Sequence, residues 1–338
     1  MKKLIKLLLI VTLALSLAAC GSEQKNEDVT IEPPSSTPSE ESTKAPTPKE
    51  DVVIRIATLA GPTGMGLVNL VNDTSGKYAV EVLTQPDQLS PKIISGEVDV
   101  ATIPSNLAAV LYNKMQGGIT VVAVNTKGVL YLLGTDESIL SFEDLDGKEV
   151  VLTGQGASPE YIVNDLLSKN NASPNIRFMT AHADLSNAMA SGDIDLAILP
   201  EPFVSITLAQ NKDLKVLVDL NEEWKALYGE DIEIPLGVTI VNNAFLKNNE
   251  EAFNDFITDY QSSVDFVNTD SDNAAKAIVE AGIFPKEAIV KLAIPRSGIT
   301  FESPDATREM LEAYFKVLFE NNPKSVGGSL PDDAFYYE

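Results

Sequence analysis

The feature that most constrains the fold of this chain is a ten-residue segment that occurs twice. Residues 95–104 read SGEVDVATIP and residues 191–200 read SGDIDLAILP, 96 positions further along. Each copy predicts a glycine that ends a helix, then a short buried strand, then a proline that stops the strand. A strand, a glycine loop and a helix are predicted before each copy, at residues 54–71 and 148–167. The chain therefore contains one β-loop-α, β-α, β unit in duplicate.

Strands that alternate with helices predict an α/β protein whose sheets carry helices on both faces. We expect two Rossmann-like lobes with mixed, mostly parallel sheets, joined by two hinge crossings. Lobe one should comprise residues 53–132 and 237–338, and lobe two residues 133–236. Ligands of open α/β sheets bind at the carboxyl ends of the strands. A ligand is therefore expected between the lobes, with closure by hinge bending.

The first twenty residues predict export. Three lysines precede an apolar stretch that is short for a membrane span, and the stretch ends in Leu-Ala-Ala-Cys at residues 17–20. This ending resembles a bacterial lipobox, which implies a signal peptide at residues 1–19 and diacylation of Cys20. An uncleaved anchor helix and a signal with a chance cysteine are the alternatives. Residues 20–51 are rich in Ser, Thr, Pro and Glu and are predicted to be a disordered tether.

Charge and cysteine content exclude several classes of protein. The sequence has 25 Lys and Arg residues against 49 Asp and Glu residues, a net charge of −24. Such a surface disfavours nucleic acid and anionic lipid, so we expect the membrane to be contacted through the lipid anchor only. Cys20 is the single cysteine. A disulfide framework, a cysteine-based zinc site and a cysteine nucleophile are therefore not expected.

The first glycine loop, GPTGMG at residues 61–66, has neither the Walker A pattern nor the dinucleotide-binding spacing. We interpret it as a helix start that is open to a ligand. Thr63 is the expected N-cap, and the amides of Gly64, Met65 and Gly66 could donate to a ligand oxygen. A tight turn without a ligand is the alternative.

The second glycine loop, GQGASPE at residues 154–160, is the counterpart of the first. Ser158 is the expected N-cap, with a proline at the first helical position. Gln155 can both donate and accept hydrogen bonds, and the backbone of Gly156 and Ala157 is the more promising ligand contact. The hydroxyl of Ser158 could serve in capping alone.

The two repeats continue differently after their final proline, and this difference could set ligand specificity. The first continues from Pro104 into Ser105 and Asn106, which could cap a helix or bind a ligand. The second continues into Glu201, which would favour a cationic or NH-donating ligand, or could be an ordinary acid of a first helical turn. Phe203 could stack on a ring or belong to the core. Because no arginine lies in these loops and Glu201 is present, a nitrogen heterocycle such as a pyrimidine-type vitamin precursor is slightly favoured over a sulfonate or nitrate.

Three further side chains are of types that often serve in binding sites. Tyr131 lies near the predicted crossing between lobes and could reach the cleft. His182 is the only histidine, and a lone histidine seldom forms a zinc site. Trp224, the only tryptophan, is more plausibly a packing residue than a ligand stacker. No metal, cofactor or catalytic residue is expected.

The ordered set of segments "IRIATL…GPTG", "SGEVDVATIP", "GVLYLL", "SFEDLDGKEVVLTGQGASPEYIVNDLL" and "SGDIDLAILPEPF" resembles type II periplasmic binding proteins. The resemblance is to the branch that serves nitrate, sulfonate, taurine and thiamine-pyrimidine importers. It implies an extracytoplasmic, monomeric substrate-binding lipoprotein, anchored to the cell membrane through Cys20. Such a protein delivers a small solute to an ABC permease and its ATPase.

Two alternatives remain open at the level of sequence. One is a sensor or binding lipoprotein that takes no part in transport. The other is an enzyme, because some menaquinone-pathway enzymes and thiamine-pyrimidine synthases share this bilobed architecture. The synthases rely on a cysteine cluster and histidines, whereas this chain has one residue of each type. The sequence therefore predicts a binding protein that is not an enzyme.

Overall fold

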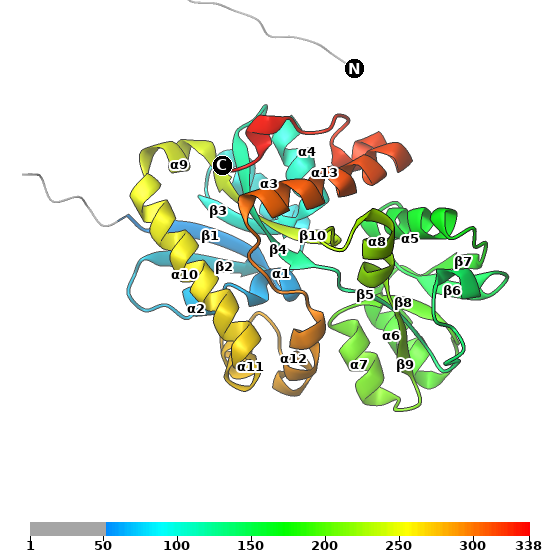
Figure 1. Cartoon of the computed structure of the whole chain (residues 1–338). Helices are drawn as coiled ribbons and strands as arrows, with labels where there is room; N and C mark the ends of the chain where they lie inside the picture. Colours follow the sequence, from blue (N-terminus) through cyan, green and yellow to red (C-terminus); the bar gives the residue numbers. More distant parts are fainter. Residues whose placement is uncertain (1–51) are drawn as a thin grey trace, which may run out of the picture. The chain divides into compact units, whose positions relative to one another are not determined.

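The structure is a computed structural model that describes residues 52–338. The predicted signal peptide, the lipidated Cys20 and the tether lie outside the described residues. The described chain forms two five-stranded sheets, each with helices packed against it (Figure 1). This confirms the predicted α/β fold class.

The first sheet has the strand order β2-β1-β3-β10-β4. Strand β1 is parallel to both β2 and β3, and β10 is antiparallel to both β3 and β4. The bounds are β1 Ile54–Leu59, β2 Tyr78–Leu83, β3 Val100–Pro104, β4 Ile119–Lys127 and β10 Pro235–Asn242.

The second sheet has the strand order β7-β6-β8-β5-β9. Strand β6 is parallel to β7 and β8, and β5 is antiparallel to β8 and β9. The bounds are β5 Leu130–Gly134, β6 Glu149–Leu152, β7 Asn175–Phe178, β8 Ala197–Pro200 and β9 Lys215–Asp219. Both sheets thus use the same plan of three neighbouring parallel strands beside an antiparallel strand.

The helices follow the strands in the predicted order. In the first part of the chain they are α1 Pro62–Met65, α2 Val68–Val71, α3 Pro86–Ser95, α4 Ser105–Lys114, α5 Ser158–Lys169, α6 His182–Ser191, α7 Phe203–Gln210 and α8 Leu220–Tyr228. After β10 they are α9 Asn243–Asn248, α10 Glu250–Thr269, α11 Ser271–Glu280, α12 Glu287–Ala293 and α13 Pro304–Asn321. Short 3₁₀ turns cover Phe142–Leu145, Ile294–Arg296 (η2), Pro323–Val326 and Asp333–Phe335.

The duplicated segment has the same structure in both copies. Gly96 ends α3 and Gly192 ends α6, both in the left-handed conformation with φ of 72° and 80°. Each glycine leads into the central strand of its five-stranded sheet, β3 or β8. The repeat therefore predicted both the helix ends and the strands correctly.

The chain passes between the sheets twice. The first crossing lies between Lys127, which ends β4, and Leu130, which begins β5. The second crossing is the segment between α8 and β10, residues 229–234, and the Gly128 amide donates to the Ile234 carbonyl at 2.9 Å. Because residues 130–132 pair with β8 and β9, they belong to the second sheet. The first crossing is thus earlier than the predicted boundary after residue 132.

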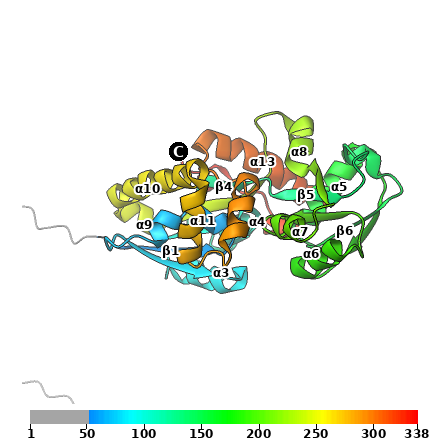
Figure 2. The ribbon, with the colours of Figure 1, turned by 90° about the horizontal axis from the view of Figure 1, so that it is seen from below.

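A shared apolar core joins the two sheets on one side. The buried cluster contains residues from both, including Leu132, Trp224 and Tyr314. Trp224 is fully buried, with its ring stacked 4.3 Å from Tyr228 and edge-on to Tyr314 at 6.2 Å. Figure 2 shows α13 beside α8, consistent with these contacts. The packing role predicted for Trp224 is confirmed.

The C-terminal tail packs against the first sheet. Phe335 is fully buried, and the Tyr337 amide donates to the Val121 carbonyl of β4 at 2.9 Å. Within residues 52–338, no helix combines the length and the apolar character that a membrane span requires.

Candidate ligand-binding site

The carboxyl ends of the central strands β3 and β8 both lie at the crossings. Ser105, which follows β3, donates its hydroxyl to the Pro235 carbonyl at 2.5 Å, where the second crossing enters β10. Glu201, which follows β8, donates its amide to the Val129 carbonyl in the first crossing at 2.9 Å. The edges at which α/β sheets bind ligands are therefore both turned toward the crossings.

Three side chains gather at this edge of the second sheet. Thr153 follows β6, His182 begins α6 after β7, and Phe203 begins α7 after β8. Thr153 Oγ1 lies 2.5 Å from His182 Nδ1, and the rings of His182 and Phe203 are 5.2 Å apart with planes tilted by 35°. Because β6, β7 and β8 are parallel, their carboxyl ends bring these residues together. We take this cluster as the core of the candidate site.

The environment of His182 favours its neutral imidazole form and leaves one of its two ring nitrogens without a hydrogen bond. Burial lowers the pKa of its side chain. The Thr153 hydroxyl occupies Nδ1, and Nε2 makes no hydrogen bond to any residue in 52–338. The ring can thus offer Nε2 to a ligand beside the face of Phe203. His182 was not predicted as a site residue, although its position at the start of the helix that follows β7 could have suggested it.

The low pKa of His182 makes stability depend on pH. A depressed histidine pKa contributes stability that is present above the unfolded value of about 6.5 and lost as pH falls through the folded value. We expect the wild type to lose more stability than the His182→Gln variant between pH 7.5 and 5.5. The difference should stay below about 1.4 kcal/mol per pH unit. Urea unfolding of both proteins at the two pH values measures it, and parallel losses would contradict a buried neutral imidazole.

The second glycine loop lies beside this cluster, and the N-cap of the helix that follows it is one residue earlier than predicted. Ala157 is the N-cap of α5 and Ser158 is its first helical residue, so the expected cap at Ser158 is wrong. The Ala157 amide donates to the Gly154 carbonyl at 3.0 Å, and the Gly156 amide donates to Glu160 Oε2 at 2.5 Å. Gln155, Gly156 and Ala157 are exposed, which leaves the Gln155 side chain open to a ligand.

The first glycine loop is a closed turn rather than an open helix start. Gly61, with φ of 99°, is the N-cap of the single-turn α1, so Thr63 lies inside the helix. The amides of Gly64 and Met65 both donate to the Gly61 carbonyl, at 3.0 and 3.2 Å, and that of Gly66 donates to the Gly64 carbonyl. Met65 is fully buried. The prediction that these three amides are free is therefore wrong, because the short turn uses them itself.

The residues after β3 are mostly structural. Pro104 ends β3 and is the N-cap of α4. Ser105 is 1% exposed and its hydroxyl bonds to Pro235. Asn106 is half-buried in the first turn of α4, and it is the side chain of this group that remains for a ligand.

Tyr314 of α13 reaches the starts of α4 and α5. Its hydroxyl is buried and makes no hydrogen bond of normal geometry with residues 52–338. Burial raises the pKa of Tyr314 to about 12, and the nearby side chains of Ser158 and Ser105 offset part of this effect. The helices that follow β3 and the second glycine loop are thus brought close to one phenol.

Glu201 is paired within the protein. Its carboxylate is fully buried and lies 2.6 Å from Arg296 Nε, while it also accepts hydrogen bonds from the amide and hydroxyl of Ser205. Burial raises the pKa of Glu201, and the Arg296 charge partly offsets this. The expectation that Glu201 attracts a cationic ligand is wrong, because an arginine 95 residues away already occupies the carboxylate.

Tyr131 belongs to the same contact. It is 6% exposed and donates its hydroxyl to the Arg296 carbonyl at 3.0 Å. Arg296 lies in η2, next to α12, whose Val290 packs in the core of the first sheet. The Glu201–Arg296 pair therefore connects the turn between β8 and α7 of the second sheet to elements on the first.

Comparison with known proteins identifies related sequences and folds. A family model described as menaquinone biosynthesis, VitK2_biosynth, matches residues 62–319. The crystal structure of an ABC transporter from Parabacteroides distasonis matches with a TM-score of 0.73 and 23% identity, over 85% of this chain and 99% of that one. The periplasmic aliphatic sulphonate binding protein SsuA from Escherichia coli matches with a TM-score of 0.65 and 14% identity, over 85% and 92%. No curated protein matches. At these identities the solved structures show the fold.

Proposed function

This chain belongs to the family VitK2_biosynth, which is described as menaquinone biosynthesis, but because its fold is that of periplasmic binding proteins, we propose that it is the extracytoplasmic solute-binding component of an ABC importer. It would capture a small solute between two lobes built on the two sheets. It would then deliver the solute to a permease that is driven by an ATPase.

One observation carries the proposal. The carboxyl ends of β3 and β8 are both tied to the crossings, through Ser105–Pro235 and Glu201–Val129. A rotation about the crossings would change the distance between the loops of the two sheets while leaving each sheet intact. This is the mechanical requirement for capture by closure.

The candidate site suggests the kind of solute. Phe203 offers a half-buried aromatic face, His182 offers Nε2, and Gln155 offers an exposed amide side chain. We propose a small organic solute with one flat or apolar part and one polar group that bonds to His182. The reason for favouring a cationic or NH-donating solute falls away, because Glu201 is neutralised by Arg296.

The export proposal rests on the sequence. The lipobox-like ending at Cys20 and the acidic composition support a monomeric lipoprotein that is held to the outer face of the cell membrane by its lipid anchor. The tether would let the folded part reach a permease in the same membrane.

An enzyme of menaquinone biosynthesis is the second candidate. The description of the family favours it, and a neutral imidazole in a site can act as a general base. The candidate site would then bind and also convert its ligand.

Ligand release and thermal unfolding test both candidates. The chain from Gly21 onward is purified and unfolded, and the released compound is identified by mass spectrometry. Re-addition at about 100 times the Kd should raise the melting temperature by about 4 °C. An unchanged compound after long incubation supports the receptor, and chemical conversion supports the enzyme. Aliphatic sulfonates, nitrate and aromatic carboxylates are the first probes if nothing is released.

Variants locate the binding site in the same assay. Phe203→Ala and His182→Gln should each weaken binding by about tenfold, the effect of one lost aromatic contact or hydrogen bond. Phe301→Ala, which removes a half-buried ring from the core of the first sheet, is the control and should change stability without changing the affinity. Unaltered affinity in both site variants would place the ligand elsewhere.

A further inference from the structure

Thr153 is fixed in place at the carboxyl end of β6. It directly follows Leu152, whose carbonyl accepts a hydrogen bond from the Met179 amide at 2.9 Å, so the ends of β6 and β7 are held together. Thr153 is 3% exposed. Its hydroxyl lies 2.5 Å from Nδ1 of His182, and its side chain makes no other hydrogen bond to residues 52–338. One hydrogen atom therefore lies between the two groups, supplied either by the hydroxyl or by the ring.

The burial of Thr153 decides which group is the donor. A hydroxyl has one hydrogen to donate. If Nδ1 of His182 carried a hydrogen and donated it to Oγ1, the Thr153 hydrogen would need a second acceptor, and residues 52–338 supply none. A buried donor without an acceptor is costly, and proteins almost always avoid it. The hydroxyl is therefore the donor, and Nδ1 is the acceptor.

This arrangement fixes the tautomer of His182. A neutral imidazole carries one hydrogen, on one of its two nitrogens. Because Nδ1 accepts, the hydrogen is on Nε2, which makes no hydrogen bond within the described chain. His182 is also the first residue of the ten-residue helix α6, and the amino end of a helix disfavours a charged imidazolium. The Nε2–H group is thus an unused donor at the amino end of a helix.

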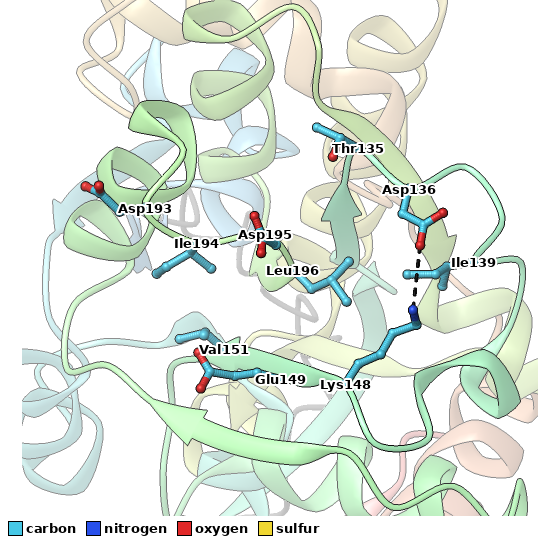
Figure 3. A pocket seen from close by; sticks show the side chains of 10 residues that line it. All are labelled: Thr135, Asp136, Ile139, Lys148, Glu149, Val151, Asp193, Ile194, Asp195 and Leu196. Carbon is cyan, nitrogen blue, oxygen red and sulfur yellow. Dashed lines mark ion pairs between the residues drawn. The ribbon is translucent and has the colours of Figure 1, made fainter.

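The pocket at the opposite end of the second sheet has a different character. It has a volume of about 410 Å³ and lies at the amino ends of β6 and β8 (Figure 3). Its side chains include Lys148, which lies 3.6 Å from Asp136, and four carboxylates, at Asp136, Glu149, Asp193 and Asp195. A solute with an acceptor group would meet mainly negative charge there. Such a solute is favoured at the carboxyl end of the sheet instead, where Nε2–H and the amino end of α6 attract negative charge.

We propose that Thr153 is a positioning residue that makes His182 a hydrogen-bond donor to the solute through Nε2. The solute would present an acceptor oxygen to it, such as that of a carboxylate or carbonyl group, with its flat or apolar part against Phe203. This proposal rests on the function proposed above, because it concerns the same solute site. It also separates the two candidate functions. A neutral imidazole with its hydrogen on Nε2 cannot accept a proton there, so that nitrogen would not serve as the general base of an enzyme.

Nitrogen-15 NMR of the imidazole tests the tautomer without any solute. His182 is the only histidine, so the chain from Gly21 onward, labelled with 15N-histidine and freed of any histidine tag, gives the signals of one ring. At about pH 8, above the unperturbed histidine pKa of about 6.5, we expect a protonated Nε2 and a bare Nδ1. The two states of nitrogen differ in chemical shift and in their couplings to the ring protons. A hydrogen on Nδ1, or comparable amounts of both tautomers, would overturn the proposal.

Variants show whether Thr153 is responsible for the tautomer. Thr153→Val has the same shape without the hydroxyl, and it should raise the fraction of rings with their hydrogen on Nδ1 by about fivefold, the effect of one hydrogen bond. Thr153→Ser retains the hydroxyl and should keep the wild-type spectrum. Circular dichroism checks that both variants fold.

Thr239→Val is the matched control. It also removes a buried hydroxyl, but one that is bonded to Asn125 in the first sheet at 3.0 Å. The imidazole signals should not change. An unchanged tautomer in Thr153→Val, or the same change in Thr239→Val, would contradict the role of Thr153.

Benzoate and benzamidine test the solute class, because they share a flat ring but benzoate offers only acceptors and benzamidinium only donors. Benzoate should shift the Nε2 signal saturably, with at least about tenfold higher affinity than benzamidine. The net charge of the chain is negative, so charge alone would give the opposite preference. No saturable shift with benzoate, or equal affinity for the two probes, overturns the assignment of an acceptor-bearing solute. Failure of the receptor function is distinct from these outcomes, because release and conversion of the bound compound test that function, whereas the tautomer is measured in protein without solute.

Discussion

Replacing Arg296 by methionine is expected to lower the free energy of unfolding by about 3 kcal/mol at pH 7. The change leaves the Glu201 carboxylate fully buried without its cation, which lies 2.6 Å away in the wild type. Removal of one partner of a buried pair is costly because the other charge stays desolvated. The lower end of the usual range applies, because Arg296 itself is 30% exposed. Urea unfolding at constant ionic strength measures the loss.

The pH dependence identifies the cause. Burial already raises the pKa of Glu201, and loss of Arg296 should raise it further. A raised carboxyl pKa contributes stability that is fully present below the unfolded value and lost as pH rises through the folded value. The loss in Arg296→Met should thus be small near pH 4 and grow toward pH 7. An equal loss at both pH values would point to packing of the arginine stem instead.

Two control variants complete this test. In the double variant with Glu201→Gln, much of the loss should be recovered, because no buried charge remains. Lys291→Met removes a lysine from an exposed pair with Asp272 and should leave the unfolding midpoint nearly unchanged.

The fold was predictable because the helix ends and strands follow from short sequence patterns that occur twice in the chain. Gly96 and Gly192 need the left-handed conformation, so each marks a helix end before a buried strand. The segments that follow were predicted as short buried strands that end at a proline, and they form β3 and β8. The first crossing was placed late because Leu130–Leu133 is apolar on every residue, and such a run does not reveal which sheet it joins.

The site was less predictable because its contacts are distant in sequence. Glu201 was interpreted as a ligand residue because it follows the strand of the second repeat, at the edge where α/β sheets bind ligands. Its partner Arg296 comes from a 3₁₀ turn that a sequence pattern does not connect to β8. The prediction for the first glycine loop was wrong for another reason. In a one-turn helix the amides of Gly64 and Met65 donate to the Gly61 carbonyl, so they are not free for a ligand. Phe203 was predicted as a possible ligand contact because it follows the second repeat, and His182 likewise begins a helix that comes after a strand.

Gly298→Ala is expected to cost more than about 3 kcal/mol, the sum of a left-handed strain and a backbone overlap. Gly298 has φ of +53°, and an added Cβ would stand 1.8 Å from the Lys127 carbonyl oxygen. The Gly298 carbonyl also accepts a hydrogen bond from the Lys127 amide at 2.8 Å. The two backbones would have to separate directly beside the first crossing, so both stability and the proposed ligand-induced closure should suffer.

Gly282→Ala is the matched control for this prediction. Gly282 has a similar φ of +70°, but an added Cβ would meet no atom within 4 Å. This variant should lose only about 1 kcal/mol, the strain of a left-handed alanine. Urea midpoints of both variants separate the two contributions. If the losses are equal, the close approach at Lys127 is not what demands glycine there. If Gly298→Ala loses much more, the segment after η2 is held tightly to the first crossing, and hinge motion must carry that segment with it.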